Sequence, residues 1–100
     1  MKVQLKEIPH WYKINVDERV REIVYELRNA GINTTNSCGC NKDEWTVEAD
    51  CLDPTTELRS IYNVMDKLNV KSYNVTIIAT LEPAYSNYRE YMRISGWYPK

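Results

Sequence analysis

The sequence predicts a single α+β domain in which two amphipathic helices pack on one face of a mainly antiparallel sheet. Two stretches carry apolar residues at helical spacing, and two others alternate apolar and polar residues as half-buried strands do. With 100 residues, the chain is long enough for one core and too short for two ordinary domains. We expect residues 1–100 to form one domain, with a core spanning residues 14–82 and terminal segments that add edge strands.

The first predicted helix follows Asn15, which begins a capping-box pattern that ends at Glu18. Before it, Pro9 indicates an irregular segment in which Trp11 anchors the packing. Gly31 is suited to end the helix, because it can adopt the positive φ of a C′ residue. Between these signals, one apolar stripe recurs at helical spacing: Val16, Val20, Ile23, Val24 and Leu27.

A hairpin and a second helix come next. Residues 32–37 and 45–52 are the predicted strands of the hairpin, with Cys38 and Cys40 in the turn between them. Asp53 is the expected N-cap of the second helix. Its apolar stripe consists of Leu58, Ile61, Tyr62, Met65 and Leu68.

The last third of the chain contains one clear strand and one ambiguous segment. Residues 73–81 alternate as a strand. Residues 85–97 fit either a short helix or a strand beside the preceding one, and Gly96 and Pro99 favour the strand. The resulting order of elements is most of a ferredoxin-like split β-α-β sandwich, with one sheet face left open.

Composition argues against several classes of protein. Thirteen basic and fourteen acidic residues leave a formal charge of −1, whereas a nucleic-acid binder normally has a basic surface. No apolar run reaches the roughly 20 residues that cross a bilayer. The first seven residues lack the apolar core of a signal peptide, so we expect a cytoplasmic protein without a membrane anchor.

The cysteines are the first candidates for chemistry. Cys38 and Cys40, with Cys51 and His10, would supply four zinc ligands. The spacing argues against zinc, because structural sites usually present paired C-x₂₋₄-C motifs and Cys51 shares a strand face with apolar residues. We therefore expect a loop with free thiols and no bound metal or other cofactor.

The open face of the sheet is the second candidate. It should carry polar residues, which in the expected arrangement are Glu48, Asp50, Thr76, Thr80 and Glu82. Such carboxylates can bind a divalent ion or act as acid and base, but a solvated strand face has the same composition. His10 is the only histidine and has no partner for a catalytic triad, so we expect no enzyme activity and no catalytic residues.

The C-terminal segment is rich in aromatic residues and arginine, which are enriched at protein interfaces. Several of these side chains could equally cover the sheet. The interface candidates are Tyr85, Tyr88, Arg89, Tyr91, Trp97 and Tyr98.

Residues 27–39, Leu-Arg-Asn-Ala-Gly-Ile-Asn-Thr-Thr-Asn-Ser-Cys-Gly, followed by Trp-Thr-Val-Glu at 45–48, resemble a group of short uncharacterised bacterial phage and prophage proteins. In that group a helix leads into Gly-Ile-Asn-Thr and then Cys-Ser-Cys-Gly. This chain has Asn36 where the group often has its first cysteine, and its second thiol is at Cys40. The resemblance covers residues 16–82 and implies a phage or mobile-element setting without a known activity.

These observations favour a non-enzymatic accessory protein that acts by protein–protein contact and forms a homodimer. Two alternatives remain. One is a small metal-binding or nucleic-acid-associated module that uses the Cys38/Cys40 loop. The other is a small-ligand sensor, which rests on fold analogy alone.

Overall fold

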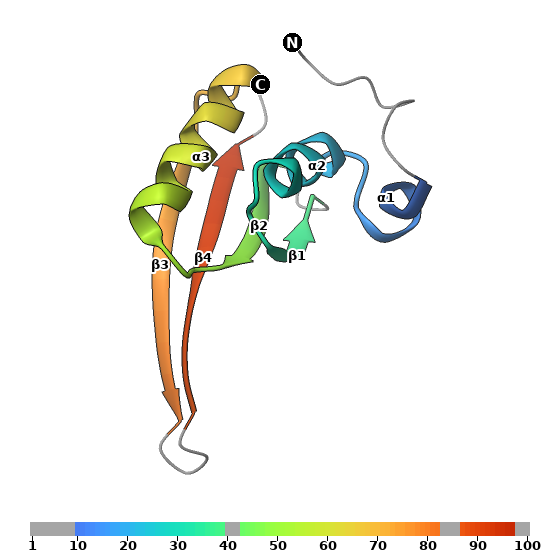
Figure 1. The fold of residues 1–100 in the computed structure, drawn as a ribbon. Coiled ribbons are helices and arrows are strands. Elements are labelled where there is room, and N and C mark those ends of the chain that lie inside the picture. Colours follow the sequence, from blue (N-terminus) through green and yellow to red (C-terminus); the bar gives the residue numbers. More distant parts are fainter. Residues whose placement is uncertain (1–9, 40–42, 83–86, 98–100) are drawn as a thin grey trace.

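The computed structural model describes residues 10–39, 43–82 and 87–97 (Figure 1). The seven elements in order are α1 (His10–Asn15), α2 (Arg21–Asn29), β1 (Thr34–Cys38), β2 (Glu44–Asp50), α3 (Pro54–Lys67), β3 (Tyr73–Glu82) and β4 (Asn87–Trp97). The expected α+β class and the strand at the end of the chain are confirmed. The N-terminal strand expected near Val3 lies outside the described residues.

The four strands form one antiparallel sheet in the order β1-β2-β4-β3. Because β2 and β3 are both antiparallel to β4, they run parallel to each other with β4 between them. Helix α3 joins β2 to β3, so this part of the chain is a split β-α-β unit, as expected. The terminal strand is an inner strand, however, and the prediction that it adds to an edge was wrong.

The inner position of β4 extends the core beyond the expected limit at residue 82. Met92 and Ile94 are fully buried, and the register places Ile94 between Val47 of β2 and Val75 of β3. Apolar burial is the main stabilising term in folding, so a strand with two such residues belongs to the centre of the core. The remaining core side chains come mainly from α2, β2 and α3.

The first long helix begins later than the sequence predicts. Asn15 ends α1, where its side-chain amide donates to the carbonyl of Trp11 at 3.0 Å, so it does not cap α2. Asp17 Oδ1 instead accepts the backbone N–H of Arg19 at 2.9 Å and stabilises a turn between the two helices. The Arg21 guanidinium donates to the carbonyl of Tyr12 at 3.0 Å and ties α2 to the end of α1. The apolar stripe is buried as expected, including Val16 and Val20 before the helix.

Both long helices end in a left-handed residue. Gly31 has φ 89° after α2, and Asn69 has φ 58° after α3. The N–H of Ile32 bonds to Leu27 C=O at 3.0 Å, and the N–H of Val70 bonds to Met65 C=O at 2.8 Å. These are Schellman motifs, which satisfy carbonyl groups at the helix ends. The predicted role of Gly31 is confirmed.

Helix α3 starts as the sequence predicts, with Asp53 as N-cap and Pro54 at the first position. The Asp53 carboxylate accepts a hydrogen bond from the Thr56 hydroxyl at 2.9 Å. Glu57 Oε1 accepts the backbone N–H groups of Leu52 and Asp53, at 2.9 and 2.8 Å. The start of α3 is thereby fixed against the end of β2.

The longest strands extend beyond the rest of the sheet. Strand β2 pairs with residues 91–97 of β4, whereas β3 pairs with residues 87–96. Residues 79–82 of β3 and 87–90 of β4 therefore form a two-stranded extension, here called the projecting hairpin (Figure 1). None of the helices within the described ranges has the length and apolar character needed to cross a membrane.

Candidate functional site

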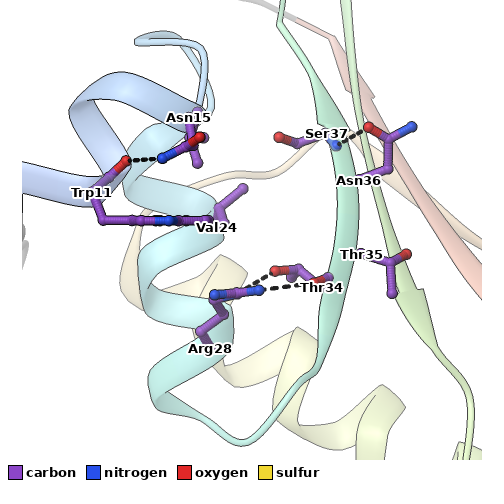
Figure 2. Close-up of a pocket in the computed structure, with 9 residues that line it drawn as sticks. Trp11, Asn15, Val24, Arg28, Thr34, Thr35, Asn36 and Ser37 are labelled. Carbon is purple, nitrogen blue, oxygen red and sulfur yellow. Dashed lines mark hydrogen bonds between the residues drawn. The ribbon is translucent and has the colours of Figure 1, made fainter.

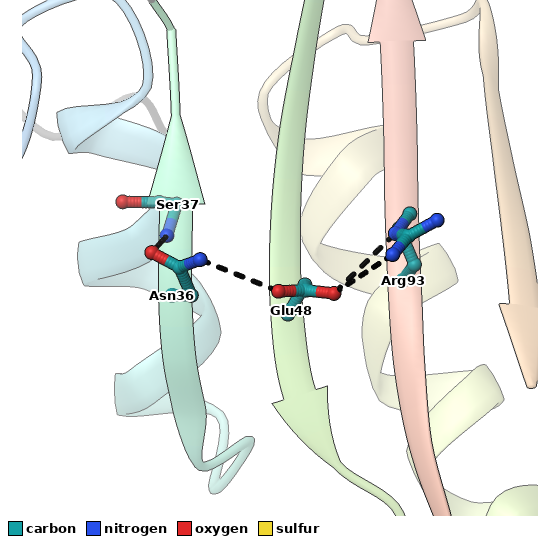
Figure 3. Close-up of polar contacts among 4 residues, drawn as sticks. All are labelled: Asn36, Ser37, Glu48 and Arg93. Atoms are coloured by element: carbon teal, nitrogen blue, oxygen red, sulfur yellow. Dashed lines mark hydrogen bonds and ion pairs between the residues drawn. The ribbon is translucent and has the colours of Figure 1, made fainter. Parts of the chain in front are cut away.

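The open face of the sheet carries a polar network across three strands (Figure 3). Glu48 accepts hydrogen bonds from the Arg93 guanidinium at 3.2 and 3.4 Å and from Asn36 Nδ2 at 3.3 Å. Asp50, the other carboxylate predicted on this part of β2, accepts the Asn33 side-chain amide at 2.5 Å. The two carboxylates are thus already engaged by neighbouring strands or loops. They act as cross-strand links, each contributing on the order of 0.2–1 kcal/mol.

The thiols predicted as metal ligands are separated by the hairpin register. Cys38 lies opposite Thr46, and Cys51 follows the other end of β2. Thr46 and Cys51 are five residue positions apart, which corresponds to about 17 Å at the usual rise. The side chains of His10 and Cys40 lie outside the described residues. Among the side chains that are described, no three His, Cys, Asp or Glu residues are grouped as a metal site would require.

Cys51 is buried at the junction of β2 and α3. Burial raises the pKa of its thiol, and the nearby carboxylates of Glu57, Glu90 and Asp53 raise the pKa further. Since the thiolate is the nucleophile, we expect Cys51 to behave as a structural cysteine with low reactivity in the folded state.

We expect Cys51 to react with iodoacetamide at least about tenfold more slowly in the native protein than in denaturant, because it is both buried and protonated. Mass spectrometry of peptides from a time course measures this rate. Cys38, which is half-buried at the end of β1, serves as the internal comparison. Equal labelling rates of Cys51 in native and unfolded protein would contradict the assignment.

A small pocket lies between α1, α2 and β1 (Figure 2). Arg28 crosses it, donating from Nε to Thr34 Oγ1 at 2.7 Å and from Nη2 to the Thr34 carbonyl at 3.1 Å. The Trp11 ring stacks on the guanidinium, with 5.2 Å between Arg28 Cζ and the ring centroid. Trp11, expected to be a packing anchor, is 51% exposed. Arg28 is therefore largely engaged in holding β1 against α2.

The predicted aromatic interface does not form one patch in the described chain. Tyr91 and Trp97 lie on the open face, opposite Asp50 and Glu44 of β2. They are six residue positions apart along the strand, which corresponds to about 20 Å. Tyr88 and Arg89 occupy the projecting hairpin, where β4 pairs with Leu81 and Thr80 of β3. Tyr85 and Tyr98 lie outside the described residues.

The structure reveals an apolar surface that the sequence analysis did not identify. Ile77 and Leu81 lie on the helix side of β3, yet they are 44% and 67% exposed. The chain direction places the start of α3 toward the projecting hairpin (Figure 1). We call Ile77 and Leu81 the apolar surface. The sequence signal for this surface is the length of β3, which has ten residues. Its apolar alternation continues beyond the part of the strand that a helix covers.

Comparisons with protein-family models, with curated proteins and with solved structures gave no significant match to this chain.

Proposed function

We propose that this protein is a non-enzymatic accessory protein that acts by protein–protein contact, in a phage or mobile-element setting of the kind its cysteine segment resembles. The observation that carries the proposal is the apolar surface of Ile77 and Leu81 on one face of β3. Large exposed apolar patches on folded domains usually mark binding surfaces. Here the exposed side chains continue the core face of the sheet beyond the cover of the helices.

The strand that holds this surface has features of a binding element. From Tyr73 to Leu81 it contains no charged residue and no proline, and its pairing with β4 shows no register shift. Such edges are normally shortened, bulged or charged to prevent association. An exposed, regular and uncharged edge beside apolar side chains therefore favours a protein partner over a soluble small molecule.

Photo-crosslinking tests the proposal. A benzophenone amino acid placed at Leu81 in cells that express the protein should yield an adduct heavier than the 11.8 kDa chain, which mass spectrometry would identify. The matched control is the same amino acid at Asn74, which is exposed on the other face of the same strand. Equal adducts at both positions, or none at Leu81, would refute contact through the apolar surface.

A further inference from the structure

We propose that the partner at this surface is a second copy of the chain, whose β3 pairs antiparallel with β3 of the first copy across a two-fold axis. This inference rests on the proposed function, since it names the partner for the same surface. The joined sheet would have eight strands, with the two β3 strands at its centre.

The register identifies which main-chain groups of β3 face outward. The N–H of Trp97 donates to the carbonyl of Ser72 at 3.3 Å, which marks these residues as a hydrogen-bonded pair. In an antiparallel ladder such pairs alternate with non-bonded pairs. The even-numbered residues of β3 therefore bond to β4. The N–H and C=O groups directed away from β4 belong to Tyr73, Val75, Ile77, Ala79 and Leu81.

These outward groups have no hydrogen-bond partner among the described residues. A main-chain donor or acceptor at an open edge can be paired by an added strand. Five consecutive outward-facing residues, each with one donor and one acceptor, match the requirements of a strand of the same length.

The opposite edge of the same sheet, strand β1, is protected against the addition of another strand. The two edges of the sheet therefore differ. Strand β1 has five residues and a register irregularity between Thr34 and Asn36. The Thr34 carbonyl accepts Arg28 Nη2 at 3.1 Å, and the Ser37 N–H donates to Asn36 Oδ1 at 3.0 Å (Figure 2). Short length, irregularity and side-chain capping all discourage strand addition at β1. Strand β3, by contrast, has ten residues and pairs with β4 without a register shift.

The sequence of β3 is complementary to itself in the antiparallel direction. The odd-numbered residues of β3 carry the outward N–H and C=O groups, so they must pair with odd-numbered residues of the second copy. Apolar side chains then meet apolar side chains on the helix side of the sheet. A two-fold axis at Ile77 pairs Tyr73 with Leu81 of the other copy and overlaps the full strand.

The same arrangement covers the exposed apolar side chains. Leu81 would contact Tyr73 of the second copy, and the two Ile77 side chains would meet at the axis. A two-fold contact closes on itself, so the same surface is used by both copies and no open-ended fibre results. A foreign strand would need to supply this pattern independently, which is why we favour a second copy.

The mass of the protein in solution and the exchange rates of the β3 backbone amides together test the pairing. Multi-angle light scattering should give twice the chain mass of 11.8 kDa. By NMR, the amides of Val75, Ile77 and Ala79 should then exchange as slowly as those of Asn74, Thr76 and Ile78, which already bond to β4. A single-chain mass would overturn the proposal. So would a dimer in which the odd-numbered amides alone exchange rapidly, because that dimer would use another surface.

Ala79→Pro is the sharpest variant, because it removes an outward N–H without touching the ladder to β4. Each dimer loses two hydrogen bonds, so dimerisation should weaken by about 30-fold or more, at about fivefold for each bond. Ala79→Val keeps the N–H and should remain dimeric. Should the proline variant fail to fold, Ile77→Lys places two like charges at the axis and should also give a monomer. Dimerisation unchanged in the folded variants would overturn the proposal.

Failure of this inference is distinguishable from failure of the proposed function. A monomer that gives a heterologous adduct at Leu81 in cells retains the function and overturns the second copy as partner. An adduct with the mass of two chains supports both the proposed function and the second copy as partner. A monomer without any adduct at Leu81 overturns both.

Discussion

Gly96→Ala is expected to destabilise the protein by about 3 kcal/mol or more, because the substitution overlaps a rigid ring inside the core. Gly96 lies directly opposite Trp45 in the β2–β4 register. A Cβ atom at this position would be 2.1 Å from Trp45 Cζ2 and 2.3 Å from Cε2. The indole is almost completely buried and has no exposed direction in which to move. For a domain of this size the midpoint of thermal unfolding should fall by about 12–24 °C.

Two comparisons isolate the cause of this loss. Ser95→Ala changes the adjacent residue, which faces the other side of the sheet, and should cost at most about 0.5 kcal/mol. In the double variant Trp45→Leu/Gly96→Ala, the added cost of the alanine should largely disappear, because neighbouring substitutions are not additive. Calorimetry or chemical denaturation measures the wild-type protein and the four variants, Gly96→Ala, Ser95→Ala, Trp45→Leu and Trp45→Leu/Gly96→Ala. An added cost that persists in the Trp45→Leu background would contradict the steric explanation.

The burial of the first apolar stripe and of β2 was predictable because it depends on local periodicity, whereas Leu58 and Tyr62 of the stripe predicted for α3 are exposed. The stripe from Val16 to Leu27 and the alternation from Trp45 to Ala49 are both buried as expected. The end of the helix at Gly31 was also predictable, since few residues adopt positive φ without strain. The start was not. Asn15 could form its side-chain hydrogen bond either forward to α2 or backward to Trp11, and the structure has the second.

Strand order could not be read from local pattern. A buried inner strand and a half-covered edge strand both alternate, so residues 91–97 carried no signal that β4 lies between β2 and β3. The candidate interface was mislocated for the same reason. The apolar alternation of residues 73–81 was visible, but its exposure depends on how far α3 reaches and on which strand forms the edge. The aromatic residues were predicted as an interface from composition alone. In the structure, Tyr91 and Trp97 lie far apart along β4.

The inner position of β4 leads to the second large expected effect. Ile94→Ala should destabilise the protein by about 3–4 kcal/mol, because it removes apolar atoms from a fully buried site and leaves a cavity. Ile94 lies between Val47 and Val75, so strands on both sides limit how far the structure can collapse into the space. Urea denaturation followed by circular dichroism measures the free energy of unfolding.

Ile78→Ala provides the matched control, since it removes the same atoms from the neighbouring strand. Ile78 lies on the open face and is only partly buried, so its loss should cost about 1 kcal/mol or less. The difference between the two variants therefore reports the position of β4 and not the intrinsic preference of isoleucine for strands. If both substitutions cost the same, Ile94 would not be enclosed from both sides, and β4 could not be the inner strand on which the split β-α-β arrangement depends.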